Sequence, residues 1–172
     1  GAKGVEEQTI KLFHVCKMRG IPIFTFVNKM DRASKDPFEL MEEIERVLGI
    51  HSYPMNWPIG IHGDFKGVYN REFARIELFE GGNHGKTIVK SVDDPVFTRL
   101  LGEHYHNILC EEIELLDMAG DEFDKSQVMK GELTPIFFGS AITNFGVQPF
   151  LEKFLELAPS PGSRLSSAGE VN

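Results

Sequence analysis

The sequence predicts an α/β fold in which a parallel sheet with helices is interrupted by an inserted α+β subdomain. Two observations predict it. Apolar runs typical of buried parallel strands occur in both halves of the chain, in "IPIFTFV" (21–27) and "TPIFFGSA" (134–141), each with helical segments beside it. Between them, short strand-like segments alternate with Gly, Asn and Pro turns, as in an antiparallel meander. We expect 1–49 and 133–159 to form the interrupted sheet, 50–132 the insertion and 160–172 a linker or tail.

The first part reads as helix, strand, helix. Helical spacing predicts an amphipathic helix over 5–19, and the apolar run 21–27 follows as a buried strand. In "DPFELMEEIERVLG", Asp36 is the expected N-cap, Pro37 the first helical residue and Gly49 the end. This order is typical of a parallel sheet.

The insertion contains four strand-like segments, namely "NWPIGI", "FKGVYN", "FARIELF" and "KTIVKSV". A long helix is expected over about 95–118 and a shorter one over about 122–130. The aromatic residues expected in the insertion core are Trp57, Phe65, Phe73 and Phe79. The closing helix, "GVQPFLEKFLELAPSP", is expected to bury Phe150, Leu151, Phe154 and Leu155.

Composition excludes several classes of protein. With 41% apolar and 26% charged residues in 172, the chain is ordinary globular material, and no apolar run approaches the roughly 18 residues of a membrane span. Cys16 and Cys110 form no C-x-x-C pair, which agrees with the cytoplasmic location that we expect. The net charge is −8, and no basic cluster interleaved with aromatic residues occurs, so we expect neither direct nucleic-acid binding nor membrane binding.

The stretch "EGGNHGKT" (80–87) nearly matches a phosphate-binding loop, G-x-x-x-x-G-K-[ST]. Gly85, Lys86 and Thr87 fit, but Glu80 stands where the first glycine belongs. A working loop opens a helix, whereas the following "KTIVKSV" is β-branched and favours a strand. We therefore expect a hairpin turn.

Polar residues follow the first apolar strand directly, as "NKMD". Ligand contacts in open parallel sheets lie at the carboxyl ends of strands. The Asp31 carboxylate can accept hydrogen bonds from guanine N1–H and the exocyclic amine, the Asn28 amide can serve the N7 side, and the Lys29 stem can lie across the ring. The alternative is a polar turn in which Asn28 or Asp31 caps the backbone.

A second candidate segment, "FFGSA", ends the other apolar strand. Here the Ala141 N–H is expected to face guanine O6, while Ser140 holds the loop and supports the Asp31 carboxylate. The tripeptide alone is uninformative. Its pairing with "NKMD", each after a buried strand, resembles the base-recognition motifs of P-loop GTPases.

Longer segments make the resemblance more specific. "VNKMDRASKDPFELMEEIE", "WPIG" followed by "FKGVYN", and "GELTPIFFGSAITNFGVQPFLEKFLELAPSP" resemble the bacterial peptide chain release factor 3 family of translational GTPases over nearly the whole chain. The elongation factor G family is similar more weakly, through "NKMDR" and a G-S-A segment followed by G-V-Q-P. The sheet is then an incomplete P-loop GTPase-type sheet.

The resemblance implies a parent that hydrolyses GTP during termination and recycles stop-codon-reading release factors from the ribosome. It also implies that the phosphate loop, the switch I threonine and the D-x-x-G of switch II lie upstream of "AKGVE". We therefore expect guanine recognition of GTP or GDP here, Mg²⁺ only in the intact parent, no catalytic residue in these 172 residues, and no hydrolysis by them alone. The alternatives are an elongation factor G-type fragment or a non-catalytic module that binds a ribosomal protein.

The resemblance implies as partners the ribosome and class I release factors, through the full-length parent. It also raises contact between the insertion and the ribosomal stalk protein. An acidic set is the candidate surface, although each member can equally belong to a solvated helix face: Glu111, Glu112, Glu114, Asp117, Asp121, Glu122 and Asp124.

The array of His104, His106 and Cys110 is the strongest metal candidate, with the last two four residues apart on an expected helix. A structural zinc site needs about four ligands, and the sequence offers no second pair. We expect no metal site.

Overall fold

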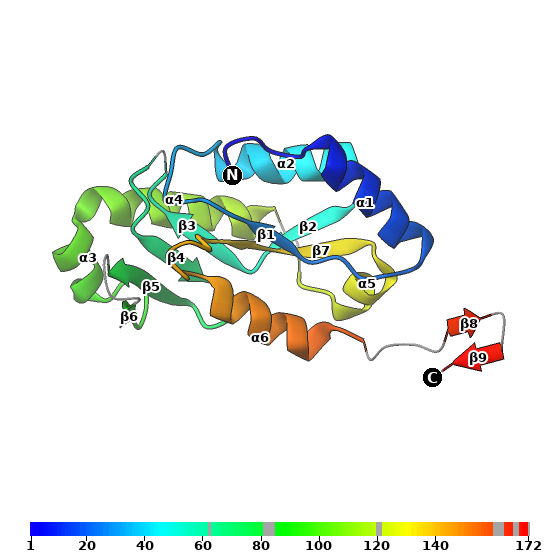
Figure 1. Cartoon of the computed structure of the whole chain (residues 1–172). Helices are drawn as coiled ribbons and strands as arrows, with labels where there is room; N and C mark the ends of the chain where they lie inside the picture. The colour runs from blue at the N-terminus through cyan, green and yellow to red at the C-terminus, as the bar shows by residue number, and fades with distance from the viewer. Residues whose placement is uncertain (62, 81–84, 120–121, 160–163, 167–168, 172) are drawn as a thin grey trace.

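A three-stranded parallel sheet forms the centre of the computed structural model, which describes residues 1–61, 63–80, 85–119, 122–159, 164–166 and 169–171. Its strands are β1 (Thr25–Val27), β2 (His51–Pro54) and β7 (Leu133–Phe138), in the order β1-β7-β2. All of β7 is buried. Figure 1 shows α1 (Glu7–Met18) and α2 (Pro37–Leu48) above this sheet and α6 (Val147–Leu157) below it. The predicted α/β class is confirmed.

Helix α2 is capped at both ends by residues of its own segment. The Asp36 carboxylate accepts hydrogen bonds from the backbone N–H groups of Phe38 at 2.8 Å and Glu39 at 3.3 Å. Gly49 ends the helix in the left-handed conformation, with φ of 64°. Its buried face, spaced by four residues, lies against the sheet and comprises Leu40, Ile44 and Leu48.

The insertion contributes a four-stranded antiparallel meander. Its strands β3 (Asn56–Ile59), β4 (Gly67–Asn70), β5 (Arg75–Glu80) and β6 (Gly85–Val89) pair in chain order, as predicted. Strands β5 and β6 pair from Glu80 opposite Gly85 onward, so "EGGNHGKT" joins the two strands of a hairpin, although 81–84 lie outside the described residues. Lys86 lies on a strand and opens no helix.

The single helix predicted over 95–118 is wrong. The structure has α3 (Pro95–Leu101) and α4 (Glu103–Met118), separated by Gly102 with φ of 92° and ψ of 166°. That conformation is open essentially to glycine alone, so the helical ladder breaks there. The N-cap of helix α5 (Lys125–Lys130) is Asp124, whose carboxylate accepts hydrogen bonds from the backbone N–H groups of Ser126 and Gln127.

The two sheets share one nearly continuous segment of chain. Strands β2 and β3 are separated only by Met55, whose N–H donates to the Ile136 carbonyl of β7 at 2.9 Å. His51–Pro54 thus lies in the parallel sheet, within the range expected for the insertion. The division of the chain into domains stays a prediction.

Two predictions of burial are wrong. Phe73 is 60% exposed, with the Arg75 guanidinium 4.8 Å from its ring centroid. In α6, Leu151, Phe154 and Leu155 are exposed. The helix turns a different side inward: Phe150 contacts the rings of Phe26 and Phe137, and the fully buried residues are Lys153 and Leu157.

The tail contains β8 (Arg164–Ser166) and β9 (Gly169–Val171), which pair antiparallel where composition indicates a linker. Among the described residues, no helix has both the length and the apolar character needed to cross a membrane.

Candidate functional site

The loops that carry "NKMD" and "GSA" leave the parallel sheet side by side. Val27, the last residue of β1, is the register partner of Phe138, the last residue of β7. Beyond these ends the pairing continues: Gly139 N–H donates to the Val27 carbonyl at 3.1 Å, and Met30 N–H donates to the Gly139 carbonyl at 3.1 Å. The fold therefore joins two segments that the sequence separates by about 110 residues.

Asn28 ties the two loops together. Its Oδ1 accepts hydrogen bonds from the Lys29 N–H at 2.7 Å and from the Ala141 N–H at 2.9 Å. Lys29 has φ of 70°, a left-handed conformation that turns the chain sharply after the strand. The Ala141 N–H, expected to face guanine O6, is here bonded to Asn28.

Three buried side-chain polar atoms have no hydrogen-bond partner among the described residues: Asp31 Oδ1, Ser140 Oγ and Ser34 Oγ. The first two belong to the candidate segments. The expected hydrogen bond between Ser140 and Asp31 is thus not formed in this structure, and Ser140 is 0% exposed. The other Asp31 oxygen, Oδ2, lies 3.7 Å from Arg32 Nε. Because an unpaired buried acceptor costs about 1–3 kcal/mol, a carboxylate in this state suits a ligand that donates N–H groups, as guanine does.

The G-S-A loop is held closely at its start. A Cβ on Gly139 would lie 2.5 Å from the Phe145 carbonyl oxygen and 2.9 Å from the Phe26 ring, so only glycine fits. Ser140 and Phe145 exchange both backbone hydrogen bonds, at 3.0 and 2.9 Å. The Phe145 ring then packs against Phe65 and Phe79 of the insertion, with centroids 5.6 and 5.7 Å away.

Sequence reasoning missed Asn56, the first residue of β3. Its side-chain amide donates through Nδ2 to the Phe138 carbonyl at 3.0 Å and accepts through Oδ1 from the Phe138 N–H at 2.7 Å. The one available signal was an asparagine inside the otherwise apolar "PMNWPIG".

Comparison with known sequences identifies the family. The model of the family described as "Elongation factor Tu GTP binding domain" matches residues 1–160. The chain belongs to this family. It is also a homologue of peptide chain release factor 3, as the resemblance predicted: it is 60% identical to that protein of Symbiobacterium thermophilum over 169 residues, covering 96% of this chain and 32% of the relative. With the Trichodesmium erythraeum protein the identity is 52% over 175 residues, covering 99% and 32%.

The chain thus spans about a third of the length of these curated relatives. Among solved structures, a protein of Thermus thermophilus aligns with a TM-score of 0.65 and 24% identity, over 94% of this chain and 26% of that one. This likeness supports the fold alone. Guanine nucleotide binding comes with membership of this family, since its members are described as GTP-binding domains.

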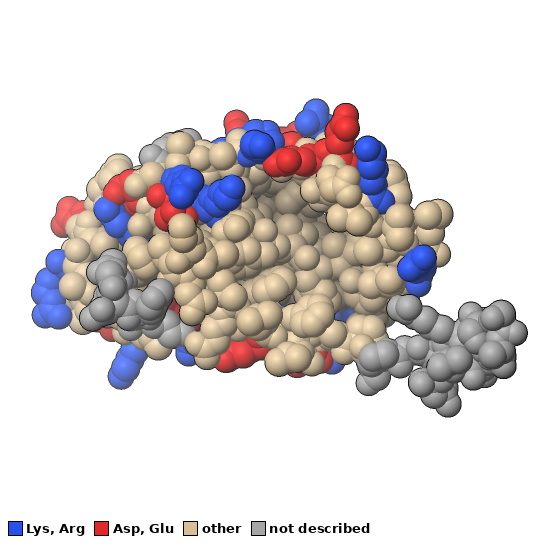
Figure 2. Space-filling model, in the orientation of Figure 1, with Lys and Arg blue, Asp and Glu red and all other residues tan. Residues whose placement is uncertain are grey.

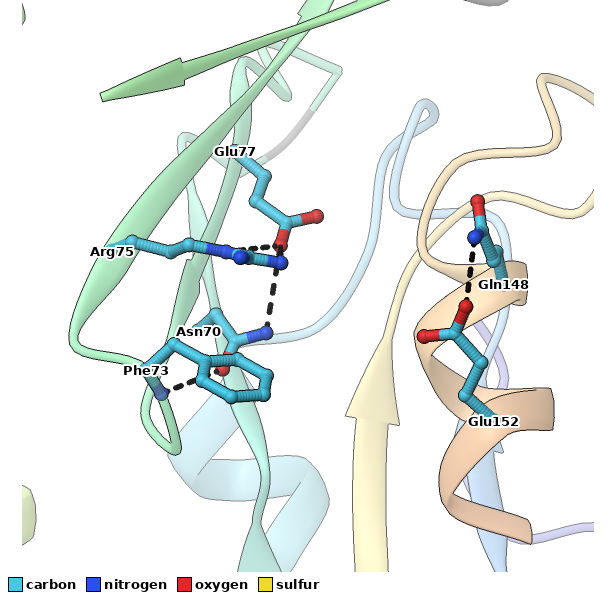
Figure 3. A network of polar contacts seen from close by, with 6 residues as sticks. All are labelled: Asn70, Phe73, Arg75, Glu77, Gln148 and Glu152. Carbon is cyan, nitrogen blue, oxygen red and sulfur yellow. Dashed lines mark hydrogen bonds and ion pairs between the residues drawn. The ribbon is translucent and has the colours of Figure 1, made fainter. Parts of the chain in front are cut away.

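A cavity of about 170 Å³ lies elsewhere in this member of the family, between β4, β5 and α6. Figure 3 shows polar contacts near it: Glu77 Oε1 accepts from Arg75 and from Asn70, and on α6 the lining residue Glu152 accepts from Gln148 at 2.7 Å. The buried Lys153 ammonium donates to Glu72 and Glu156 at 2.7 and 2.8 Å. None of residues 28–31 or 139–141 lines this cavity, and its charges are largely paired with one another.

The metal candidate of the sequence does not assemble a cluster. Cys110 Sγ lies 3.8 Å from the nearer His106 ring nitrogen. The described residues contain no group of three or more His, Cys, Asp or Glu side chains placed to hold a metal ion. Burial raises the pKa of the Cys110 thiol, and the Asp93 and Glu114 carboxylates raise it further, which disfavours the thiolate that a metal requires.

The acidic set divides into bonded and exposed members. Glu112 accepts from Trp57 Nε1 at 3.0 Å, Asp117 pairs with Arg71 at 3.3 Å, and Asp124 caps α5. Asp121 lies outside the described residues. Glu111, Glu114 and Glu122 are exposed, and the first two lie on α4; Asp117 is exposed too, although it is paired with Arg71.

Proposed function

We propose that this chain is the base-recognising part of the GTP-binding domain of a translational GTPase acting in termination, whose parent recycles stop-codon-reading release factors from the ribosome in the cytoplasm. One observation carries the proposal. The two loops that follow β1 and β7 meet at the sheet edge, and a buried Asp31 carboxylate oxygen there has no partner among the described residues. Membership of a family of GTP-binding domains supports it.

Each residue has a role that its chemistry allows. Asp31 accepts from guanine N1–H and the exocyclic amine, Asn28 Nδ2 serves N7, and the Lys29 stem covers the ring. Ser140 Oγ supports the Asp31 carboxylate when the nucleotide is bound. The Ala141 N–H contacts O6, and on binding it shares or leaves its bond to Asn28 Oδ1.

Hydrolysis belongs to the whole protein in this proposal. The 172 residues contain no match to G-x-x-x-x-G-K-[ST], so we expect the chain alone to hydrolyse no GTP and to bind guanine nucleotides weakly. Mg²⁺ and the phosphate contacts act only in the intact parent. Neither direct nucleic-acid binding nor membrane binding by this chain is part of the proposed function.

The test is a titration of the chain with fluorescent GDP, displaced by unlabelled GDP and, separately, by ADP. We expect displacement by GDP but not by ADP, and loss of binding in Asp31→Ala. Lys86→Ala, on β6, is the matched control and leaves binding unchanged. Equal displacement by ADP, or unchanged affinity in Asp31→Ala, would refute guanine recognition.

A second candidate function is docking on a ribosomal stalk protein through α4. The observation that favours it is the exposure of Leu115 and Met118 beside Glu111 and Glu114, since apolar side chains among charges are typical of interaction surfaces. Reversing the charges of Glu111, Glu114 and Glu122 is expected to weaken stalk-protein binding by the full-length factor. If binding persists unchanged, this face has no docking role; Glu112 and Asp124 are left intact because both are bonded within the fold.

A further inference from the structure

We propose that Asn56 is a positioning residue for the loop 139–146, and that the inserted sheet thereby holds the guanine-binding geometry in place. The inference rests on the proposed guanine recognition and adds a residue outside both motifs. It also assigns the insertion a role at the nucleotide site, in addition to any contact with a partner.

The backbone pairing between β2 and β7 ends just before Asn56. Pairing between these strands runs to Pro54 opposite Ile136, and the Met55 N–H adds one bond to the Ile136 carbonyl. The chain then leaves the parallel sheet, because the next residue, Asn56, pairs through its backbone with Asn70 of β4. The Asn56 side chain takes over where the strand leaves, and it satisfies both backbone polar groups of Phe138.

The peptide group between Phe138 and Gly139 is the last one before the loop 139–146. Its carbonyl oxygen accepts from Asn56 Nδ2, and its N–H donates to the Val27 carbonyl of β1. The peptide is thus fixed from both sides of β7 by two different parts of the chain. Ala141, whose N–H is bonded to Asn28, is only three residues beyond Phe138. Any rotation of this peptide would move Ser140 and Ala141 directly.

Asn56 and Phe138 are both buried. Asn56 is 3% exposed and Phe138 is 0% exposed, so both bonds between them lie inside the protein. A smaller side chain at position 56 would leave both Phe138 groups unpaired, an arrangement that folded proteins rarely tolerate.

The far end of the loop has a second support from the insertion. Phe145, which exchanges backbone bonds with Ser140, packs between the rings of Phe65 and Phe79. The loop is therefore held at its start by β3 and at its end by aromatic residues of the insertion. A shift of the insertion relative to β7 would therefore displace Ala141.

Asn70 offers a matched control. It is the register partner of Asn56 and is also buried, at 8% exposure, yet its side chain bonds to Phe73 and Glu77 and not to β7. Substitution of either asparagine removes a buried amide from the same sheet. We expect only the substitution of Asn56 to change the geometry of the proposed nucleotide site.

The experiment compares Asn56→Ala, Asn56→Ser and Asn70→Ala in the 172-residue chain. The first readout is amide hydrogen exchange of Ser140 and Ala141 without nucleotide. We expect exchange in the Asn56 variants to be faster by about tenfold, and near wild type in Asn70→Ala. Asn56→Ser is shorter than asparagine but keeps a neutral polar group in the buried site, so it serves as the folded variant if Asn56→Ala loses its native spectrum.

The second readout is GDP affinity, which we expect to fall about tenfold in the Asn56 variants and to stay unchanged in Asn70→Ala. If all three variants show the same exchange and affinity, Asn56 is only a structural residue and the inference is overturned, while guanine recognition stands. If the wild-type chain binds no guanine nucleotide, the proposed function fails, and the exchange of Ser140 and Ala141 still decides whether Asn56 positions the loop.

Discussion

Gly139 shows how a single missing side chain sets the geometry of the site. With no Cβ, it lets the Phe145 carbonyl and the Phe26 ring approach the start of the loop. We expect Gly139→Ala to destabilise the chain by about 1–3 kcal/mol, since overpacking against backbone cannot relax cheaply. Urea denaturation measures the loss, and NMR shifts of Ser140 and Phe145 locate it.

Gly20→Ala is the control for this change. Gly20 differs from Gly139 in having a positive φ of 62°, but a Cβ added to it has open space around it, and it lies far from the loop in sequence. Its substitution should strain only the turn after α1. A Gly139→Ala chain with wild-type stability and unshifted Ser140 and Phe145 resonances would show that the close approach does not exist in solution.

Glu112 is a half-buried acid with a predictable response to pH. Burial raises the pKa of its carboxyl, and Asp36 and Glu111 raise it further, against the lowering effect of the Trp57 hydrogen bond. Because the folded-state pKa lies above the unfolded value of about 4.3, the native state holds the proton more tightly. Stability contributed by this group is therefore lost as pH rises from that value through the folded pKa.

Glu112→Gln removes this cost and keeps an oxygen to accept from Trp57 Nε1. We expect the melting temperature to rise by about 1–3 °C at about pH 7.5 and to match wild type near about pH 3.5. Thermal melts across this pH range measure it, with the exposed Glu114→Gln as the control. A constant difference at every pH would contradict the assignment of the effect to Glu112 ionisation.

At the scale of elements, the cap of α2 is the clearest local determinant. The Asp36 carboxylate satisfies two backbone donors at the start of the helix. We expect Asp36→Ala to lower the free energy of unfolding by about 0.5–2 kcal/mol, and Asp36→Asn to change it little, since Asn caps nearly as well. Equilibrium denaturation of both variants measures this; an equal loss in both would point to the charge of Asp36 and not to its capping.

Elements with local signals were predictable from sequence, whereas those that depend on tertiary packing were not. The signals that define α2, namely Asp36, Pro37 and Gly49, all lie within one short segment of sequence. The side that α6 buries is set by what lies opposite, and Lys153 is buried because Glu72 and Glu156 receive its ammonium. The break at Gly102 was missed because a single glycine inside a helical pattern is usually tolerated.

The same distinction holds for the candidate site. Residues of "NKMD" and "GSA" could be placed together because the carboxyl ends of neighbouring parallel strands share an edge. Asn56 could not be placed there, because its bonds to Phe138 depend on where the chain leaves one sheet for the other. The bond of Ala141 to Asn28 likewise depends on side-chain geometry that no motif contains.

At the scale of the whole molecule, one face is hollowed and uncharged. Figure 2 shows it at the centre of the view, where Figure 1 places the edge strand β1 between α1 and α6. Met18 on α1 is 80% exposed and Leu155 on α6 is 77% exposed. Exposed apolar surface beside a strand edge favours association between chains.

We therefore expect the isolated chain to self-associate as its concentration rises. Met18→Glu combined with Leu155→Glu should raise the midpoint concentration of association about tenfold, because charges on α1 and α6 oppose burial of their exposed apolar side chains. Sedimentation velocity over a range of concentrations measures it, with Glu114→Gln again as the control. A wild-type chain that stays monomeric throughout, or a double variant that associates equally, would contradict this expectation.

The position of β7 in the middle of the parallel sheet sets an order of events during synthesis. Its neighbours β1 and β2 are made first, yet they cannot pair until residues 133–138 leave the ribosome, because neither touches the other. The β3–β6 meander needs only contacts between successive strands and is complete by Val89. Local pairings of this kind form faster than distant ones. The β3–β6 sheet is thus available as a folded template when β7 emerges, and β7 is the last strand of the parallel sheet to be set.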